Sequence, residues 1–400
     1  MEESAPEGAV GRRVAVQRKL AGLTQQQLAA RAHVSTSLVS QVEQGAVPAS
    51  PAFTAAVARA LGIDVEALTG QPYGPPITDP KAEHAGIPAL RAALDNEDDP
   101  DFEGFPMPAT ELRIRLDQCQ AHRMKSRYAA VVAALPELLN HAYAIVNNAQ
   151  PGHDAETAWA LLDDAYALIQ TVTSRFGYFD LAALAARCGR DAATRAGDPL
   201  RAAVATLRYT DPRLRRGDYP AVLRVLDRGH VLIEGESSPI AHAVRADLHL
   251  HQAQVYARSG QRDRADEHIN EARQLVAGGV PAQPFYGVNS FAANVDFHWV
   301  AAAVELSDGT TAVGRAEQVQ IPEHDEPSAV GRHWINVARA WTLHGDRAKA
   351  LTALNQARRI TPQKARYSPD VRETVHLLAE HDRRATDSLA GFARWLGVTL

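Results

Sequence analysis

Apolar residues recur at three- and four-residue spacing along most of this chain, most clearly from Ala109 to the C-terminus. That spacing is the periodicity of helices that bury one face. Alternating runs of valine, isoleucine and threonine, which would indicate strands, are scarce, whereas alanine, leucine, arginine, glutamate and glutamine are abundant. The pattern therefore predicts an all-α protein.

Five short helices are predicted near the N-terminus, each bounded by capping or helix-breaking residues. They span residues 10–21, 25–31, 36–44, 52–61 and 64–68. Thr24, Ser35 and Asp64 are the expected N-caps of the second, third and fifth helices. Because only residues 32–34 separate the second helix from the third, these two must cross at a steep angle, as in a helix-turn-helix.

Changes in composition divide the chain into regions. Eight prolines fall between residues 71 and 109, together with an acidic run at residues 95–103, and this composition favours a linker with at most a short helix near residues 89–94. The predicted regions are a disordered N-terminus at 1–9, a helix-turn-helix domain at 10–70, a Pro-rich acidic linker at 71–109 and a helical repeat domain at 110–400.

The segment LTQQQLAARAHVSTSLVSQVEQG resembles the helix-turn-helix of the phage-repressor and Cro-like (XRE) family, and the resemblance covers roughly residues 10–69. It implies a DNA-binding domain whose third helix lies in the major groove. The contacts that it implies are a phosphate at Gln25 and bases at or beside Ser35, Thr36, Ser37, Ser40 and Gln41. Gln41 is the strongest candidate, because its amide can both donate to and accept from adenine.

The charged residues of this domain have two interpretations. Arg13 and Lys19 either contact phosphates or only cover the exposed face of the first helix. Glu43 would repel DNA if it pointed outward, so we expect a structural ion pair with Arg18, similar to the Arg–Glu pair of phage repressors. The acidic linker is either a solvated spacer or a segment that competes with DNA for this domain.

The chain departs from the family pattern in two places. His33 stands in the turn where glycine is usual, and the loop at residues 46–50 lacks the lysine or arginine often found there. Few neutralised phosphates mean weak binding at physiological salt, because affinity follows the number of counterions released. We therefore expect a homodimer, with two copies binding a double-stranded DNA operator.

The distribution of charge supports this local DNA-binding role. The whole chain carries a net charge of −5, which excludes a polybasic coat protein. Residues 10–62 hold six basic residues against one acidic residue, a local charge of +5. With two cysteines, no signal-like start and no long apolar span, we expect a cytoplasmic protein without a membrane partner.

The C-terminal region repeats at a spacing close to that of tetratricopeptide (TPR) units, which are helix pairs of about 34 residues. The clearest copy spans residues 331–362, with Trp334, Ala338 and Ala350 at packing positions. A second copy covers residues 253–272. Further copies are expected around 216–226 and 307–309, with a poorly conforming unit at 155–197 and two capping helices at 368–397.

Stacked TPR units form a superhelix with a concave face. TPR geometry places five polar or charged side chains on that face, namely Asp247, Gln254, Arg332, Asn336 and Arg339. Arginines and amides suit an extended peptide effector, whose backbone and carboxylates need such partners. The alternative is a plain scaffold in which the arginines pair internally with aspartate and glutamate.

The order of parts resembles helix-turn-helix/TPR regulators of high-GC actinobacteria and peptide-sensing TPR regulators of Gram-positive bacteria. It implies a transcriptional repressor or activator that senses a peptide or small-molecule effector, or one whose TPR array docks a protein partner. An enzyme is a weaker hypothesis. Residues 309–315 have phosphate-loop spacing but lack its Lys-Ser/Thr, and His242, His249 and His251 lack an acidic partner, so we expect no cofactor and no metal.

Overall fold

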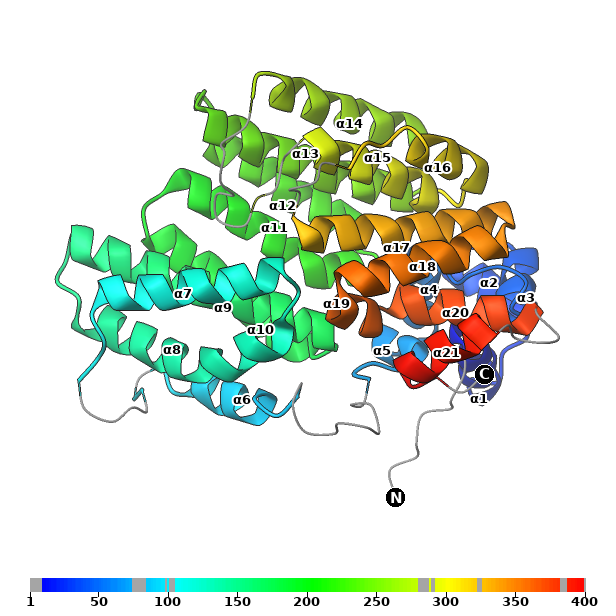
Figure 1. The fold of residues 1–400 in the computed structure, drawn as a ribbon, viewed down its shortest axis with the longest axis horizontal. Helices are drawn as coiled ribbons and strands as arrows, with labels where there is room; N and C mark the ends of the chain where they lie inside the picture. Colours follow the sequence, from blue (N-terminus) through cyan, green and yellow to red (C-terminus); the bar gives the residue numbers. More distant parts are fainter. Residues whose placement is uncertain are drawn as a thin grey trace.

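The computed structural model describes residues 9–73, 84–97, 99–100, 105–279, 288, 292–321, 326–381 and 387–398. Within these residues the chain forms 21 helices, α1 to α21 (Figure 1). The predicted all-α class is therefore confirmed. The N-terminus expected to be disordered at 1–9 lies outside the described residues except for Ala9, and so do residues 98 and 101–103 of the acidic run.

Five helices form the N-terminal domain around a small apolar core. They are α1 (Val10–Leu20), α2 (Gln25–Ala32), α3 (Thr36–Glu43), α4 (Pro51–Leu61) and α5 (Val65–Thr69). Val14, Leu28, Val39, Val57 and Leu68 are fully buried between them. The predicted boundaries agree with the structure to within a residue or two, because α2, α3 and α4 begin at capping side chains, and α4 and α5 end at glycines. Asp64 precedes α5 as predicted but makes no side-chain cap hydrogen bond.

The C-terminal region is an array of six helix pairs followed by three further helices. The pairs are α7 (Ala109–Met124) with α8 (Tyr128–Asn148), α9 (His153–Phe176) with α10 (Phe179–Arg195), α11 (Pro199–Arg215) with α12 (Tyr219–Leu232), α13 (Pro239–Arg258) with α14 (Arg262–Ala277), α15 (Ala292–Glu305) with α16 (Gly309–Ala316), and α17 (Pro327–His344) with α18 (Arg347–Ile360). Then come α19 (Pro362–Arg366), α20 (Pro369–His381) and α21 (Asp387–Leu396). Buried alanines, among them Ala338, Ala350 and Ala357, let α17 and α18 pack closely.

The first helices of successive pairs pack on one another, from α11 through α13, α15 and α17 to α20, and the array bends until α17 also contacts α7. Gln363 of α19 accepts the amide hydrogen of Tyr128 at 2.5 Å, so the start and the end of the array meet. Phe176 is fully buried here, with its ring centroid 4.8 Å from that of Tyr367. The superhelix is thus closed by contacts between distant pairs.

The segment predicted as a linker contributes to this core. Helix α6 (Ile87–Asp95) packs on α8, and it buries Ile87, Leu90 and Leu94. It is longer than the short helix expected at residues 89–94, because these apolar residues at three- and four-residue spacing give it one buried face. The prolines and acidic residues around this segment favoured a linker, but the apolar spacing gives a packed helix.

Helix α8 is, among the described residues, the one helix that is long and apolar enough to cross a membrane. Of the most apolar stretch of this helix, 56% is buried inside the protein. Its side chains Leu135, Leu138 and Leu139 are fully enclosed by neighbouring helices. This burial is what a core helix of a helical array requires.

The N-terminal domain is docked on the array and lies beside α20 and α21 in Figure 1. The carboxylate of Glu373 on α20 accepts hydrogen bonds from the amides of Val10, at 3.0 Å, and Ala49, at 3.3 Å. At a second point, Arg59 of α4 donates to the carbonyls of Arg216 and Gly217 at 3.4 and 3.2 Å. Two separate attachments therefore fix the domain.

We expect acid to destabilise the array through His333 of α17, which is 2% exposed and stacked on Phe297. Burial, reinforced by Arg332, lowers the pKa of His333 to about 4. The unfolded chain, with a histidine pKa of about 6.5, then binds more protons between pH 6.5 and about 4, so stability present above pH 6.5 is lost as the pH falls. At pH 5 the loss should be about 2 kcal/mol relative to pH 7.5.

Urea unfolding at pH 7.5 and pH 5 checks this expectation. His333→Leu should have a smaller difference between the two pH values than the wild type. His153→Leu, at a side chain that is 90% exposed, should leave the difference unchanged. An equal pH difference in His333→Leu and the wild type would contradict the assignment.

Candidate functional site

The helix-turn-helix is built from two capped helices and a left-handed turn. Thr24 and Gln27 cap α2 reciprocally, since the Thr24 hydroxyl accepts the Gln27 amide at 3.2 Å and the Gln27 side chain accepts the Thr24 amide at 2.8 Å. Ser35 caps α3 through the amide of Leu38 at 3.1 Å. His33 has φ 55° and adopts without glycine the left-handed conformation that the turn requires.

One face of α3 is exposed and polar. Thr36, Ser37 and Gln41 are exposed, whereas Val39 and Val42 are buried on the opposite face. Ser40 is half-buried, and its hydroxyl accepts a hydrogen bond from Gln44 at 3.2 Å. The hydroxyl of Ser35 is already used as a helix cap. The side chains that remain presented to solvent are therefore Thr36, Ser37 and Gln41.

Behind this face, α1 is joined to α3 by an ion pair. Arg18 donates to both carboxylate oxygens of Glu43, at 2.6 and 2.9 Å, and the two side chains are 12% and 5% exposed. Hydrogen bonding to Glu43 raises the pKa of Arg18. The expected Arg18–Glu43 pair is thus present, and Glu43 points inward.

Gln25 takes part in the same cluster. Its side-chain nitrogen donates to Glu43 at 2.8 Å, so this amide group links the start of α2 to α3. The resemblance placed Gln25 on a phosphate, and sequence analysis missed this inward contact. Since the side-chain nitrogen is engaged, a phosphate at this position would meet the backbone amides at the start of α2.

The two basic residues proposed for phosphates are placed differently. Lys19 is exposed at the end of α1. Arg13 is half-buried, donates to the carbonyls of Leu68 and Thr69 at 3.4 Å, and has a pKa lowered by burial. Arg13 holds α1 against α5, and its contact with a phosphate stays a prediction.

On the inner face of the array, both arginines proposed for the effector are paired within the chain. Arg332 donates to the Asn294 side chain at 3.0 Å. Arg339 lies 3.1 Å from Glu305 and 3.9 Å from Asp370. Asn336 lies beside Arg339 at 3.4 Å, Asp247 is buried, and Gln254 is half-buried. Arg339 thus has the acidic partners of the scaffold alternative, because a buried charge needs such partners, whereas Arg332 is held by the asparagine side chain.

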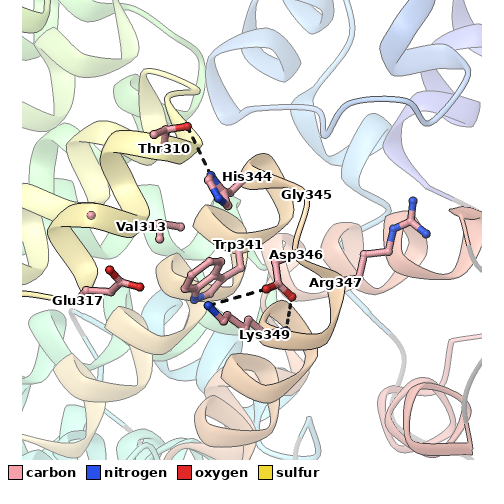
Figure 2. Close-up of a pocket in the computed structure, with 10 residues that line it drawn as sticks. Thr310, Val313, Glu317, Trp341, His344, Gly345, Asp346, Arg347 and Lys349 are labelled. Carbon is pink, nitrogen blue, oxygen red and sulfur yellow. Dashed lines mark hydrogen bonds and ion pairs between the residues drawn. The ribbon is translucent and has the colours of Figure 1, made fainter.

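An open groove of about 860 Å³ lies between α16, α17 and α18, and Figure 2 shows the side chains that line it. The Lys349 amine lies 4.0 Å from the centre of the Trp341 ring, and Asp346 caps α18 through the Lys349 amide at 3.0 Å. Residues 309–315, which have phosphate-loop spacing, form most of α16 here. Gly309 is needed because a Cβ would lie 2.6 Å from the backbone of His344. This segment is therefore a turn and helix of the repeat array.

Three of the histidines pack in a row, with His249 between His230 and His268. His249 and His268 approach to 2.9 Å between their Nδ1 atoms, and burial lowers the pKa of His249 to about 3. His251 hydrogen-bonds to the carbonyl of Asp247 at 2.8 Å. Over the part of the chain that the structure describes, no three histidine, cysteine or acidic side chains come together as metal ligands would.

Comparison with known proteins adds a family for the N-terminal domain. Residues 9–69 match the helix-turn-helix domain family. A search of curated proteins found no match. Among solved structures, BtubC (BKLC) from P. vanneervenii is 16% identical, with a TM-score of 0.38 over 60% of this chain and 91% of that chain. PlcR from Bacillus thuringiensis, solved with the peptide PapR7 and DNA, is 13% identical, with a TM-score of 0.32 over 88% of this chain and 94% of that one.

The family match and the geometry fall on the same residues. The matched span begins one residue before α1 and ends with α5. It contains the capped α2, the turn at His33 and the exposed face of α3. Residues 9–69 therefore form a helix-turn-helix domain of the XRE-like kind, and the helices α6 to α21 follow it in the described part of the chain.

Proposed function

We propose that this protein is a sequence-specific DNA-binding transcriptional regulator whose reading helix is α3. The observation that carries the proposal is the exposed polar face of α3, which the inward Arg18–Glu43 pair holds from behind. The major groove accepts one α-helix, and Thr36, Ser37 and Gln41 offer the hydroxyl and amide groups that hydrogen-bond to base edges. We assign DNA binding to residues 10–70 and place the protein in the cytoplasm.

Dimerisation and effector sensing are proposed for residues 110–400. With Arg13 engaged internally, few basic side chains remain for phosphates, so one copy should bind weakly at physiological salt. Two copies on successive major grooves, about 34–36 Å apart, would supply the missing affinity. A homodimer formed through the array therefore fits the small basic surface.

Two candidate functions of the array follow from its inner face. A peptide or small-molecule effector would have to displace the internal partners of Arg332 and Arg339. The internal hydrogen bond and ion pair of these arginines count against the first candidate. In the second candidate, the array docks a protein partner. Genome-wide recovery of bound DNA with and without culture extract separates them, because only an effector-sensing regulator changes its occupancy when extract is added.

Gln41→Ala in the full chain is expected to weaken discrimination between the preferred site and a single-base variant by about 5- to 150-fold. A bidentate amide–adenine contact contributes about 1–3 kcal/mol of such discrimination. Selection from a randomised DNA library identifies the site, and titration measures both affinities.

Gln118→Ala is the matched control, because Gln118 is an exposed glutamine on α7, outside the helix-turn-helix domain. It should leave discrimination unchanged. If Gln41→Ala retains the wild-type preference and affinity, α3 does not read DNA in the way proposed.

A further inference from the structure

Helix α20 presents carboxylates to the backbone of the helix-turn-helix domain. Glu373, which is 8% exposed, binds the amides of Val10 and Ala49. Val10 is the first residue of α1, where unpaired amides carry partial positive charge, and Ala49 lies just before α4. Two turns further along α20, Glu380 lies 3.6 Å from Arg12. The position of α20 therefore decides how the domain is held.

Helix α20 also contacts a row of charged side chains that runs across the first helices of the array. Asp370 lies 3.9 Å from Arg339 of α17, which lies 3.1 Å from Glu305 of α15. The second oxygen of Glu305 is 3.1 Å from Arg258 of α13. We call these four residues the charge row. Glu305 is 8% exposed, and both arginine side chains are 13% exposed, so water screens these three charges weakly, whereas Asp370 at the end of the row is partly exposed.

The two sets of contacts meet on one helix. Asp370 and Glu373 are three residues apart on α20, which places them on the same face one turn apart. A cavity of about 20 Å³, lined by Ala49, Arg339 and both carboxylate residues among others, lies between the domain and the array. That volume has room for about one water molecule.

We propose that α20 couples the array to the helix-turn-helix domain, with the charge row at one end of the coupling and Glu373 at the other. A shift of α17 against α15 moves Arg339, and with it Asp370 and the rigid turn that carries Glu373. The carboxylate then leaves the amides of Val10 and Ala49, and the domain loses one of its two attachments to the array. Polar interfaces of this kind between domains permit relative motion.

Hydrogen–deuterium exchange of the full chain tests the coupling. Arg339→Met keeps an unbranched apolar stem and removes the charged guanidinium group. Peptides that contain Val10 and Ala49 should exchange about tenfold faster, the effect of losing a contact worth about 1.4 kcal/mol, although neither residue touches Arg339. Glu373→Gln should accelerate the same peptides directly.

The matched control is Arg315→Met, which removes another buried arginine of the array, paired with Asp266 at 2.9 Å outside the charge row. It should leave the Val10 and Ala49 peptides at wild-type rates. Equal acceleration in this control, or no acceleration in Arg339→Met, would overturn the coupling. If Arg339→Met does not fold, Asp370→Asn cuts the row at a side chain that is 37% exposed and gives the same two readings. No DNA enters the measurement, so its outcome is independent of the proposed regulator function.

Discussion

Replacing Arg18 with methionine is expected to unfold the helix-turn-helix domain while the array stays folded. The substitution leaves the Glu43 carboxylate, whose side chain is 5% exposed, with the Gln25 amide but without its cation. Breaking a buried ion pair on one side costs about 3–5 kcal/mol, because a buried charge loses its compensation. That is a large fraction of the stability of a domain of this size. Specific DNA binding should be lost together with the anchor of α3.

Amide exchange across α1–α3 measures the effect within the full chain. Lys19→Met is the matched control, since Lys19 is the exposed neighbour of Arg18 and surface substitutions change stability by less than about 0.5 kcal/mol. Wild-type protection of α2 and α3 in Arg18→Met would show that the pair does not hold the reading helix.

Phe176→Ala is expected to open the contact between the start and the end of the array. Phe176 is fully buried at the end of α9, and its ring lies 4.8 Å from the rings of both His84 and Tyr367 and 6.2 Å from that of Tyr128. Removing a phenylalanine from such a site costs about 3–5 kcal/mol in lost burial and cavity formation. Urea unfolding gives the loss, and amide exchange of α19 locates it.

Phe179→Ala provides the comparison three residues away. Phe179 is half-buried beneath the guanidinium group of Arg215, at 3.9 Å, and its loss should cost about 1 kcal/mol. Equal losses in the two variants would mean that Phe176 is an ordinary packing residue and not the point of closure.

The features predicted correctly from the sequence are those decided by neighbouring residues. Thr24 and Ser35 cap helices within three residues of themselves, so the helix-turn-helix could be located by inspection. The small residues of α17 and α18 likewise identify one repeat. The Arg18–Glu43 pair joins residues farther apart in the sequence, and the resemblance to phage repressors, not a local pattern, indicated Arg18 as the partner.

Other roles depended on partners that no local pattern reveals. Arg13 binds carbonyls 55 and 56 residues away, and Glu373 binds an amide 363 residues away. The second contact depends on how far the superhelix has turned after six pairs, since small rotations accumulate along an array. Arg339 offered a signal that could have been used. Glu305 comes 34 residues earlier, which is one repeat length. Residues one repeat apart lie next to each other in the stack, so the opposite charges of Arg339 and Glu305 could have been paired from the sequence.

The double attachment of the helix-turn-helix domain has a consequence for the choice of operator. A domain tethered by a flexible linker can reach half-sites at many separations. This domain is instead held against the array at two points, by Glu373 and by Arg59. If two copies associate through their arrays, the arrays fix the distance between the two α3 helices. Such a dimer would accept one half-site spacing and reject an operator lengthened by half a helical turn, even with both half-sites intact.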